Sequence, residues 1–201
     1  MSTDTWLAFA LFAFVSSITP GPNNTMLLAS GVNFGFVRSL PHMAGVTVGF
    51  CLMILLMGLG LGSVFVRFPV LYTVLRYVGG TYMLYLAWKI FRSQPASSTD
   101  SSAAAAKPMG FTAAAAFQWV NPKAWVMALG SVTTYLPAQH TPWQLLALVG
   151  LMGVINMPTT STWALFGSRL RRYLQEPVFL RIFNTLAALA LVASLYPLLI
   201  H

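Results

Sequence analysis

Two apolar stretches, each long enough to cross a membrane, are interrupted near their middle by prolines and polar residues. The first carries the run Thr19-Pro20-Gly21-Pro22-Asn23-Asn24, and the second carries Asn121-Pro122-Lys123. In hydrocarbon an unpaired backbone N–H or C=O group is costly, so an interrupted helix is tolerated only where the freed groups face protein, water or a ligand. The sequence therefore predicts two transmembrane helices that are broken at mid-membrane.

The composition is that of an integral membrane protein. Of the 201 residues, 57% are hydrophobic and only 7% are charged, and the mean hydropathy is strongly positive. The net charge of +8 would suit nucleic acid in a soluble protein, but here the basic residues lie in short stretches between apolar runs. We therefore expect the lipid bilayer, and no nucleic acid, as a partner. The N-terminus lacks the basic region of a cleaved signal peptide, so the first apolar run is expected to be retained.

We expect an all-α membrane protein with about six transmembrane helices in one integral membrane domain. The predicted spans are Trp6–Val32, Met43–Val66, Val70–Phe91, Phe111–Leu136, Trp143–Phe166 and Val178–Ile200. The first half comprises residues 1–92 and the second half residues 111–201. The stretch 93–110 between them is polar and poor in large apolar side chains, which predicts a flexible cytoplasmic linker.

The distribution of Lys and Arg predicts the orientation in the membrane, because basic loops favour the cytoplasmic side. One set of alternate loops holds Arg38, Lys89, Arg92, Lys107, Arg169, Arg171, Arg172 and Arg181, and the other set holds only Arg67 and Arg76. Both termini are therefore expected in the periplasm. Each half contains three predicted helices, an odd number, so the two halves enter the membrane from opposite sides. Any structural repeat between them is expected to be inverted.

Lys123 is the only charged residue well inside a predicted span. It lies about twelve residues, or roughly 18 Å along a helix, from either end of its span, which is beyond the reach of a lysine side chain. A charge within the membrane must face a polar cavity or a counter-ion. The three acidic residues, Asp4, Asp100 and Glu176, lie at an end or in loops. Three explanations stay open: an anionic group of a substrate, such as an amino-acid carboxylate, backbone carbonyls at a break, or a neutral lysine.

The first break offers complementary partial charges. Pro20 and Pro22 lack N–H groups, and Gly21 tolerates unusual backbone angles, so the helix is expected to unwind and to restart at 22–25. The new helix N-terminus suits a carboxylate, and free carbonyls near residues 17 and 18 suit an ammonium. We therefore predict a site for a zwitterion, although helix capping is the alternative role for each Asn and Thr. Its predicted residues are Thr19, Pro20, Gly21, Pro22, Asn23, Asn24, Asn121, Pro122 and Lys123.

Other residues are expected to support this site. Gln118, Tyr82, Tyr85 and Asn156 are predicted to surround it. Proton coupling usually relies on a titratable group in the membrane, and the candidates here are Lys123 and His42. The sequence contains no buried nucleophile with a base and no cluster of metal ligands, so we expect neither an enzyme, nor a metal, nor a cofactor. A metal-ion or other small-solute exporter, or a non-transporting membrane scaffold, is the alternative function.

At these residues the chain resembles the lysine-exporter (LysE) and homoserine/threonine-resistance (RhtB) family of bacterial amino-acid exporters. The resemblance rests on residues 19–24, on the helix-contact spacing of Gly45 and Gly49, on Leu86-Ala87-Trp88-Lys89 and on residues 121–123. It implies a homodimeric secondary transporter of the bacterial inner membrane that exports amino acids or their derivatives, driven by the proton motive force. Residues 43–50 and 117–121 are most similar to the branch that exports cysteine and O-acetylserine, with threonine, homoserine or leucine as alternative substrates.

Overall fold

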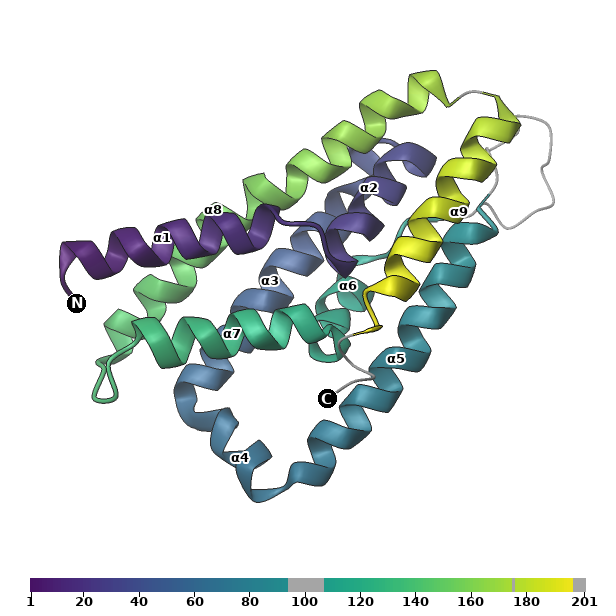
Figure 1. Ribbon diagram of the computed structural model, residues 1–201. Helices are drawn as coiled ribbons and strands as arrows, with labels where there is room; N and C mark the ends of the chain where they lie inside the picture. The colour runs from purple at the N-terminus through teal and green to yellow at the C-terminus, as the bar shows by residue number, and fades with distance from the viewer. Residues whose placement is uncertain (94–106, 175, 197–201) are drawn as a thin grey trace.

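The computed structural model describes residues 1–93, 107–174 and 176–196, and every regular element in these ranges is helical (Figure 1). The α-helices are α1 (Thr3–Ile18), α2 (Pro22–Phe34), α3 (Leu40–Leu56), α4 (Gly62–Arg67), α5 (Pro69–Phe91), α6 (Phe111–Phe117), α7 (Pro122–Tyr135), α8 (Pro142–Leu170) and α9 (Pro177–Ala193). Short 3₁₀ turns span Val37–Ser39, Gln118–Val120 and Arg171–Tyr173, and a π-helical turn, Met57–Leu61, joins α3 to α4. The all-α prediction is confirmed. Most of the predicted linker lies outside the described residues.

Length and apolar character identify the helices that can cross a membrane. Within the described residues two continuous helical stretches qualify, Val37–Val64 and Pro142–Tyr173. The pair α1 and α2 passes the same test together and counts as a third candidate span if it crosses as one, with a bend of 53° at its break, and α9 is a shorter apolar helix. The chain is therefore a multi-pass membrane protein. The count of six spans and the inverted repeat stay predictions.

Both predicted breaks are present in the structure. α1 ends at Ile18, and α2 restarts with Pro22 at its first position, where the missing N–H leaves no helical hydrogen bond unmade. The second break lies at Asn121, whose backbone is extended because the following Pro122 disfavours a helical conformation in its predecessor. Pro122 then begins α7. In both broken helices a proline therefore begins the helix that follows the break, α2 in the first and α7 in the second.

The broken helix of each half packs against the long helix of the other half. α1 and α2 contact α8, whereas α6 and α7 contact α3. α5 and α9 run side by side as a separate pair (Figure 1). A buried apolar cluster that includes Phe9, Phe50, Trp125 and Met152 joins α1, α3, α7 and α8. Because each broken helix packs against a helix of the other half, the two breaks lie next to each other.

Glycines permit the closest helix contacts. At Gly45 and Gly49 a methyl group would collide with the backbone of α6, and Gly31 and Gly167 allow an equally close approach of α2 and α8. The helix contact predicted from the spacing of Gly45 and Gly49 is therefore confirmed. Because lipid provides little hydrophobic drive for helix association, close van der Waals packing supplies much of the stabilisation.

We predict that Gly49→Ala destabilises the protein, because the new methyl carbon would lie 2.5 Å from the α-carbon of Ala115. Such overpacking costs about 1–3 kcal/mol. The measurement is the melting temperature of the detergent-purified protein. Gly150→Ala on α8 is the matched control, since its methyl group would meet nothing within 4 Å. Equal melting temperatures for the two variants would contradict a tight contact between α3 and α6.

Candidate functional site

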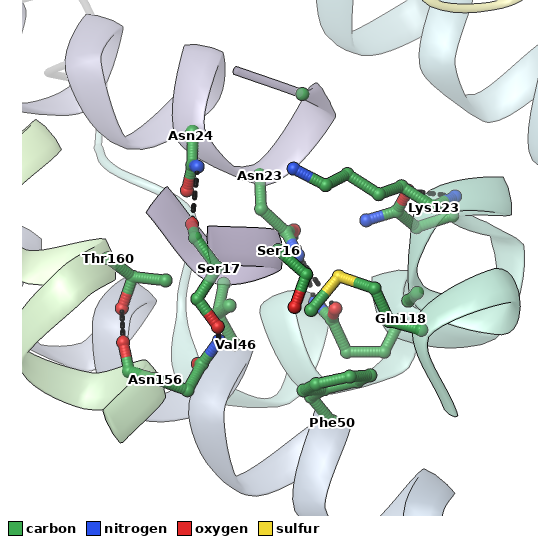
Figure 2. A pocket seen from close by; sticks show the side chains of 14 residues that line it. Ser16, Ser17, Asn23, Asn24, Val46, Phe50, Gln118, Lys123, Asn156 and Thr160 are labelled. Carbon is green, nitrogen blue, oxygen red and sulfur yellow. Dashed lines mark hydrogen bonds between the residues drawn. The ribbon is translucent and has the colours of Figure 1, made fainter. Parts of the chain in front are cut away.

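Polar residues from both breaks line one small cavity (Figure 2). Its volume is about 30 Å³, far below the roughly 300 Å³ at the lower end of small-molecule sites. An amino acid therefore fits only if neighbouring side chains move. The lining residues come from α1, α2, α3, the second break, α7 and α8, and are Ser16, Ser17, Gly21, Asn23, Asn24, Val46, Phe50, Gln118, Asn121, Lys123, Ala124, Met127, Asn156 and Thr160.

The ammonium of Lys123 is bound by the opposite break. Its Nζ donates to the carbonyl of Thr19 at 2.7 Å, to the hydroxyl of Thr19 at 2.9 Å and to the carbonyl of Pro20 at 3.4 Å. Among the explanations considered from the sequence, the structure therefore has backbone carbonyls as the partner of Lys123. Three acceptors match the three N–H donors of an ammonium, and their dipoles offset part of its desolvation.

The other carbonyls at the end of α1 are also hydrogen-bonded, which corrects the expectation that they are free. The side-chain amide of Asn24 donates to the carbonyls of Ser17 and Thr19, at 2.8 and 2.7 Å. The indole N–H of Trp163 on α8 donates to the carbonyl of Ile18 at 3.2 Å. Because a carbonyl oxygen has two lone pairs, an ammonium at this end of α1 would share these oxygens with the donors already bound to them or replace those donors.

Gly21 is required by a close approach and not by its backbone angles. Its φ of 178° and ψ of 179° are extended, a conformation open to other residues, so the sequence-based reason for glycine here is wrong. A β-carbon at this position would lie 2.7 Å from Cδ and 3.2 Å from Nζ of Lys123. The absence of a side chain lets the lysine stem lie directly against the first break.

A pair of amides forms the second link between the breaks. Asn23 donates to Oε1 of Gln118 at 2.8 Å, and Gln118 donates back to Oδ1 of Asn23 at 3.2 Å. Gln118 also donates to the carbonyl of Ala114, and it is fully buried. Gln118 thus contacts Asn23, one of the residues predicted for the site, directly.

Asn121 and the two helix-starting prolines shape the breaks. Oδ1 of the buried Asn121 accepts the backbone N–H of Lys123 at 3.1 Å and thereby caps α7. The capping alternative considered from the sequence therefore holds for this residue. Of the predicted site residues, Thr19 and Pro20 are exposed and do not line the cavity, and neither do Pro22 and Pro122, which begin α2 and α7. Pro22 and Pro122 act on the site by setting where each half-helix starts.

Asn156 lines the cavity as predicted and connects three helices. It donates to the hydroxyl of Ser17 at 3.0 Å and accepts from the hydroxyl of Thr47 at 3.1 Å. Figure 2 shows Asn156 directed at Ser17 beside Thr160. α8 continues through Pro158 without a break. Sequence reasoning missed Ser16, Ser17 and Thr160, although the spacing of four residues from Asn156 to Thr160 indicates a shared helix face.

Tyr82, Tyr85 and His42 do not line this cavity. They line a second and larger one, which α2, α3 and α5 enclose together with residues 107–110 and 113. The structure thus separates Tyr82 and Tyr85 from Lys123, near which the sequence analysis expected them, whereas His42 was considered only as a proton carrier. Tyr82 keeps an indirect connection, because its ring lies 6.1 Å from that of Phe117, the neighbour of Gln118.

Comparisons with known proteins identify the family of the chain. The family model described as LysE type translocator matches residues 14–195. The cysteine/O-acetylserine efflux protein of Klebsiella pneumoniae subsp. pneumoniae is 34% identical over 169 residues, which cover 82% of this chain and 83% of that protein. The proteins of the same name from Salmonella typhimurium and Escherichia coli strain K12 are 34% and 33% identical over 192 residues, which cover 92% of both partners in each comparison. No solved structure gives a significant match. The resemblance noted in the sequence is confirmed, and the chain belongs to the LysE family of translocators.

Proposed function

We propose that this protein exports small neutral amino acids or their derivatives across the bacterial inner membrane, with O-acetylserine and cysteine as the first candidates. Membership of a translocator family supports transport, and the names of relatives at 33–34% identity support these substrates. The observation that carries the proposal is the contact of the Lys123 ammonium with the backbone carbonyls of Thr19 and Pro20. This contact places the positive charge of Lys123 beside backbone carbonyl dipoles at the break of the first transmembrane helix.

A zwitterion binds here by exchange with Lys123. The substrate ammonium takes over the carbonyls of Thr19 and Pro20, which already accept hydrogen bonds from an ammonium. The substrate carboxylate then pairs with the displaced Lys123 and with the N–H groups of the first turn of α2. Movement of the lysine stem away from Gly21 enlarges the cavity. Each charge of the substrate thus finds an opposite charge or dipole, so the bound complex carries no unpaired charge into the membrane.

The same charges favour neutral zwitterions over cationic amino acids. Lys123 already supplies one positive charge, and none of the described residues that line the cavity is acidic. The side chain of a lysine substrate would add a second positive charge at membrane depth without a fixed partner. We therefore expect small neutral amino acids to be transported in preference to lysine.

Coupling, orientation and assembly are proposed from the family resemblance and from the charge distribution. Export is driven by the proton motive force, with Lys123 or His42 as the proton-carrying residue. Both termini lie in the periplasm, which assigns α1 and α7 to the outer half of the membrane and α2 and α6 to the inner half. The protein acts as a homodimer.

Transport by the wild type and by Lys123→Met tests the proposed function. In inside-out vesicles with an imposed proton gradient, we expect saturable uptake of O-acetylserine, cysteine or another small neutral amino acid, and little uptake of lysine. Loss of a charged hydrogen-bond partner, worth about 1.5–3 kcal/mol, should lower uptake by Lys123→Met roughly 10- to 100-fold.

Arg67→Met removes an exposed cation at the end of α4 and is the matched control for Lys123→Met. It should transport at the wild-type rate. Wild-type uptake by Lys123→Met would rule out the proposed site. Absence of amino-acid uptake by the wild type, in vesicles shown to contain the protein, would rule out the proposed export.

We predict that Gly21→Ala impairs transport much more than folding. The added methyl group displaces only the flexible stem of Lys123, so the destabilisation should stay below about 1 kcal/mol. The displaced ammonium can no longer reach Thr19 and Pro20 in the same geometry, and uptake should fall several-fold. Initial rates of uptake and melting temperatures are measured for Gly21→Ala and for Gly62→Ala, whose methyl group would meet nothing within 4 Å. Equal transport by the two variants would show that the close approach at Gly21 has no role.

The dependence on the proton motive force is tested by adding a protonophore to the same vesicles. We expect concentrative uptake to collapse while the exchange of labelled for unlabelled substrate continues, because exchange needs no net driving force. Potassium with valinomycin, which removes only the electrical gradient, separates the two components of the force. Concentrative uptake that survives the protonophore would contradict proton coupling and would leave amino-acid export intact.

A further inference from the structure

A second cavity lies along α2, on the side where α2 faces α3 and α5. Its volume is about 960 Å³, within the range of small-molecule sites and far larger than that of the first cavity. α2 lines both cavities: Asn23 and Asn24 at its start face the first, and Ser30 and Asn33 further along face the second. The basic end of α5 lines the second cavity, so the predicted orientation places its opening on the cytoplasmic side.

The charges around this cavity are of one sign. Lys89, Arg92 and Lys107 line it, and none of its described lining residues is acidic. The guanidinium of Arg92 lies 4.6 Å from the ring centroid of Trp88, and Nζ of Lys89 lies 5.8 Å from that of Tyr85. These rings restrict where the two cations lie. A concave surface with positive charges and partly apolar walls raises the local concentration of anions.

His42 gives this cavity a polar group without a partner. It lines the cavity, only 2% of its surface is exposed, and neither ring nitrogen makes a hydrogen bond in the structure. Buried polar atoms in proteins are almost always hydrogen-bonded. A neutral imidazole offers one N–H donor and one acceptor nitrogen, which suit a carboxylate and an ammonium respectively. The basic residues and His42 therefore point to a ligand that carries a carboxylate.

We propose that this cavity is a cytoplasmic vestibule that binds the amino-acid zwitterion before it reaches the Lys123 site, an inference that rests on the proposed export function. The carboxylate binds at Lys89 and Arg92, and His42 makes a further polar contact. Met26 and Tyr82, which line the vestibule, pack in one apolar cluster with Phe117, the residue before Gln118 of the first cavity. We place this apolar layer between the two cavities. Transfer from the vestibule to the Lys123 site thus requires displacement of this layer.

Thiol labelling tests the vestibule without relying on transport. Met109→Cys in a Cys51→Ser background introduces one partly buried thiol that lines the cavity and keeps every polar residue of the proposed site. An anionic and a cationic methanethiosulfonate reagent are applied to inside-out vesicles, with Ser30→Cys as the second reporter if the first variant does not fold. The quantity measured is the rate of labelling by the anionic reagent divided by the rate by the cationic reagent. We expect this ratio to be several-fold higher at the introduced thiol than at a free thiol in solution.

The variants assign this preference to the vestibule. The double substitution Lys89→Gln/Arg92→Gln should return the ratio to that of a free thiol. Arg172→Gln removes a basic residue that does not line the cavity and should keep the preference. A ratio equal to that of a free thiol before any substitution, or the same loss in Arg172→Gln, would overturn the proposal.

Protection by O-acetylserine tests the ligand. We expect millimolar O-acetylserine to slow labelling at least two-fold, both with Lys123 present and with Lys123→Met, because the vestibule lies outside the Lys123 site. His42→Gln should weaken this protection.

No protection in vesicles that transport O-acetylserine would overturn the vestibule and leave the proposed function standing. Protection by added phosphatidylglycerol alone would assign the cavity to a lipid headgroup and would also overturn the proposal. Failure of the proposed export function is recognised separately, because the uptake experiment would then show that the wild type transports no amino acid.

Discussion

The structure depends on hydrogen bonds that cross from one broken helix to the other. Hydrocarbon cannot pair freed backbone groups, so each break in a membrane helix must be satisfied by protein, by water in a cavity or by a ligand. Lys123 beside the second break binds the carbonyls of Thr19 and Pro20 in the first, and Asn23 and Gln118 exchange hydrogen bonds between the two. This requirement brings the two halves of the chain together and explains why one break accompanies the other.

The bonds that stabilise the breaks also define what the site can do. In this conformation the ammonium of Lys123 occupies the acceptors that we assign to a substrate ammonium, and the cavity holds only about 30 Å³. In the proposed mechanism the substrate ammonium replaces the Lys123 ammonium at these carbonyls, and the substrate carboxylate pairs with Lys123. Every charge therefore keeps an oppositely charged or polar partner. Similar bonds before and after the exchange allow binding at a small net change in free energy, which suits a transporter that must also release its cargo.

Local features of the chain were predictable because their effects are local. The prolines at positions 20, 22 and 122 lie next to glycine or asparagine and mark helix ends or starts, whereas the isolated Pro158 lies inside α8. Gly45 and Gly49 stand one helical turn apart on one face, which is also a local signal. The contacts of Ser17 and Trp163 were not predictable. Trp163 donates to Ile18, which is 145 residues earlier, and Asn156 donates to Ser17, which is 139 residues earlier. Serine and tryptophan are common on helices, and no local pattern distinguishes those with a distant partner.

The amino-acid sequence by itself determined the class of protein, the positions of both breaks, and that Lys123 lies within a predicted span far from any acidic residue. Hydrophobicity, proline and charge have effects that do not depend on which helices pack together. Only the tertiary structure decided that Lys123 binds carbonyls, that Gly21 is needed to admit its stem, and that Tyr82 and His42 line a different cavity. These outcomes depend on which helices pack together. Helix packing is a sum of many weak and non-directional contacts between distant segments, so apart from small-residue spacings such as that of Gly45 and Gly49 it leaves little local mark in the sequence.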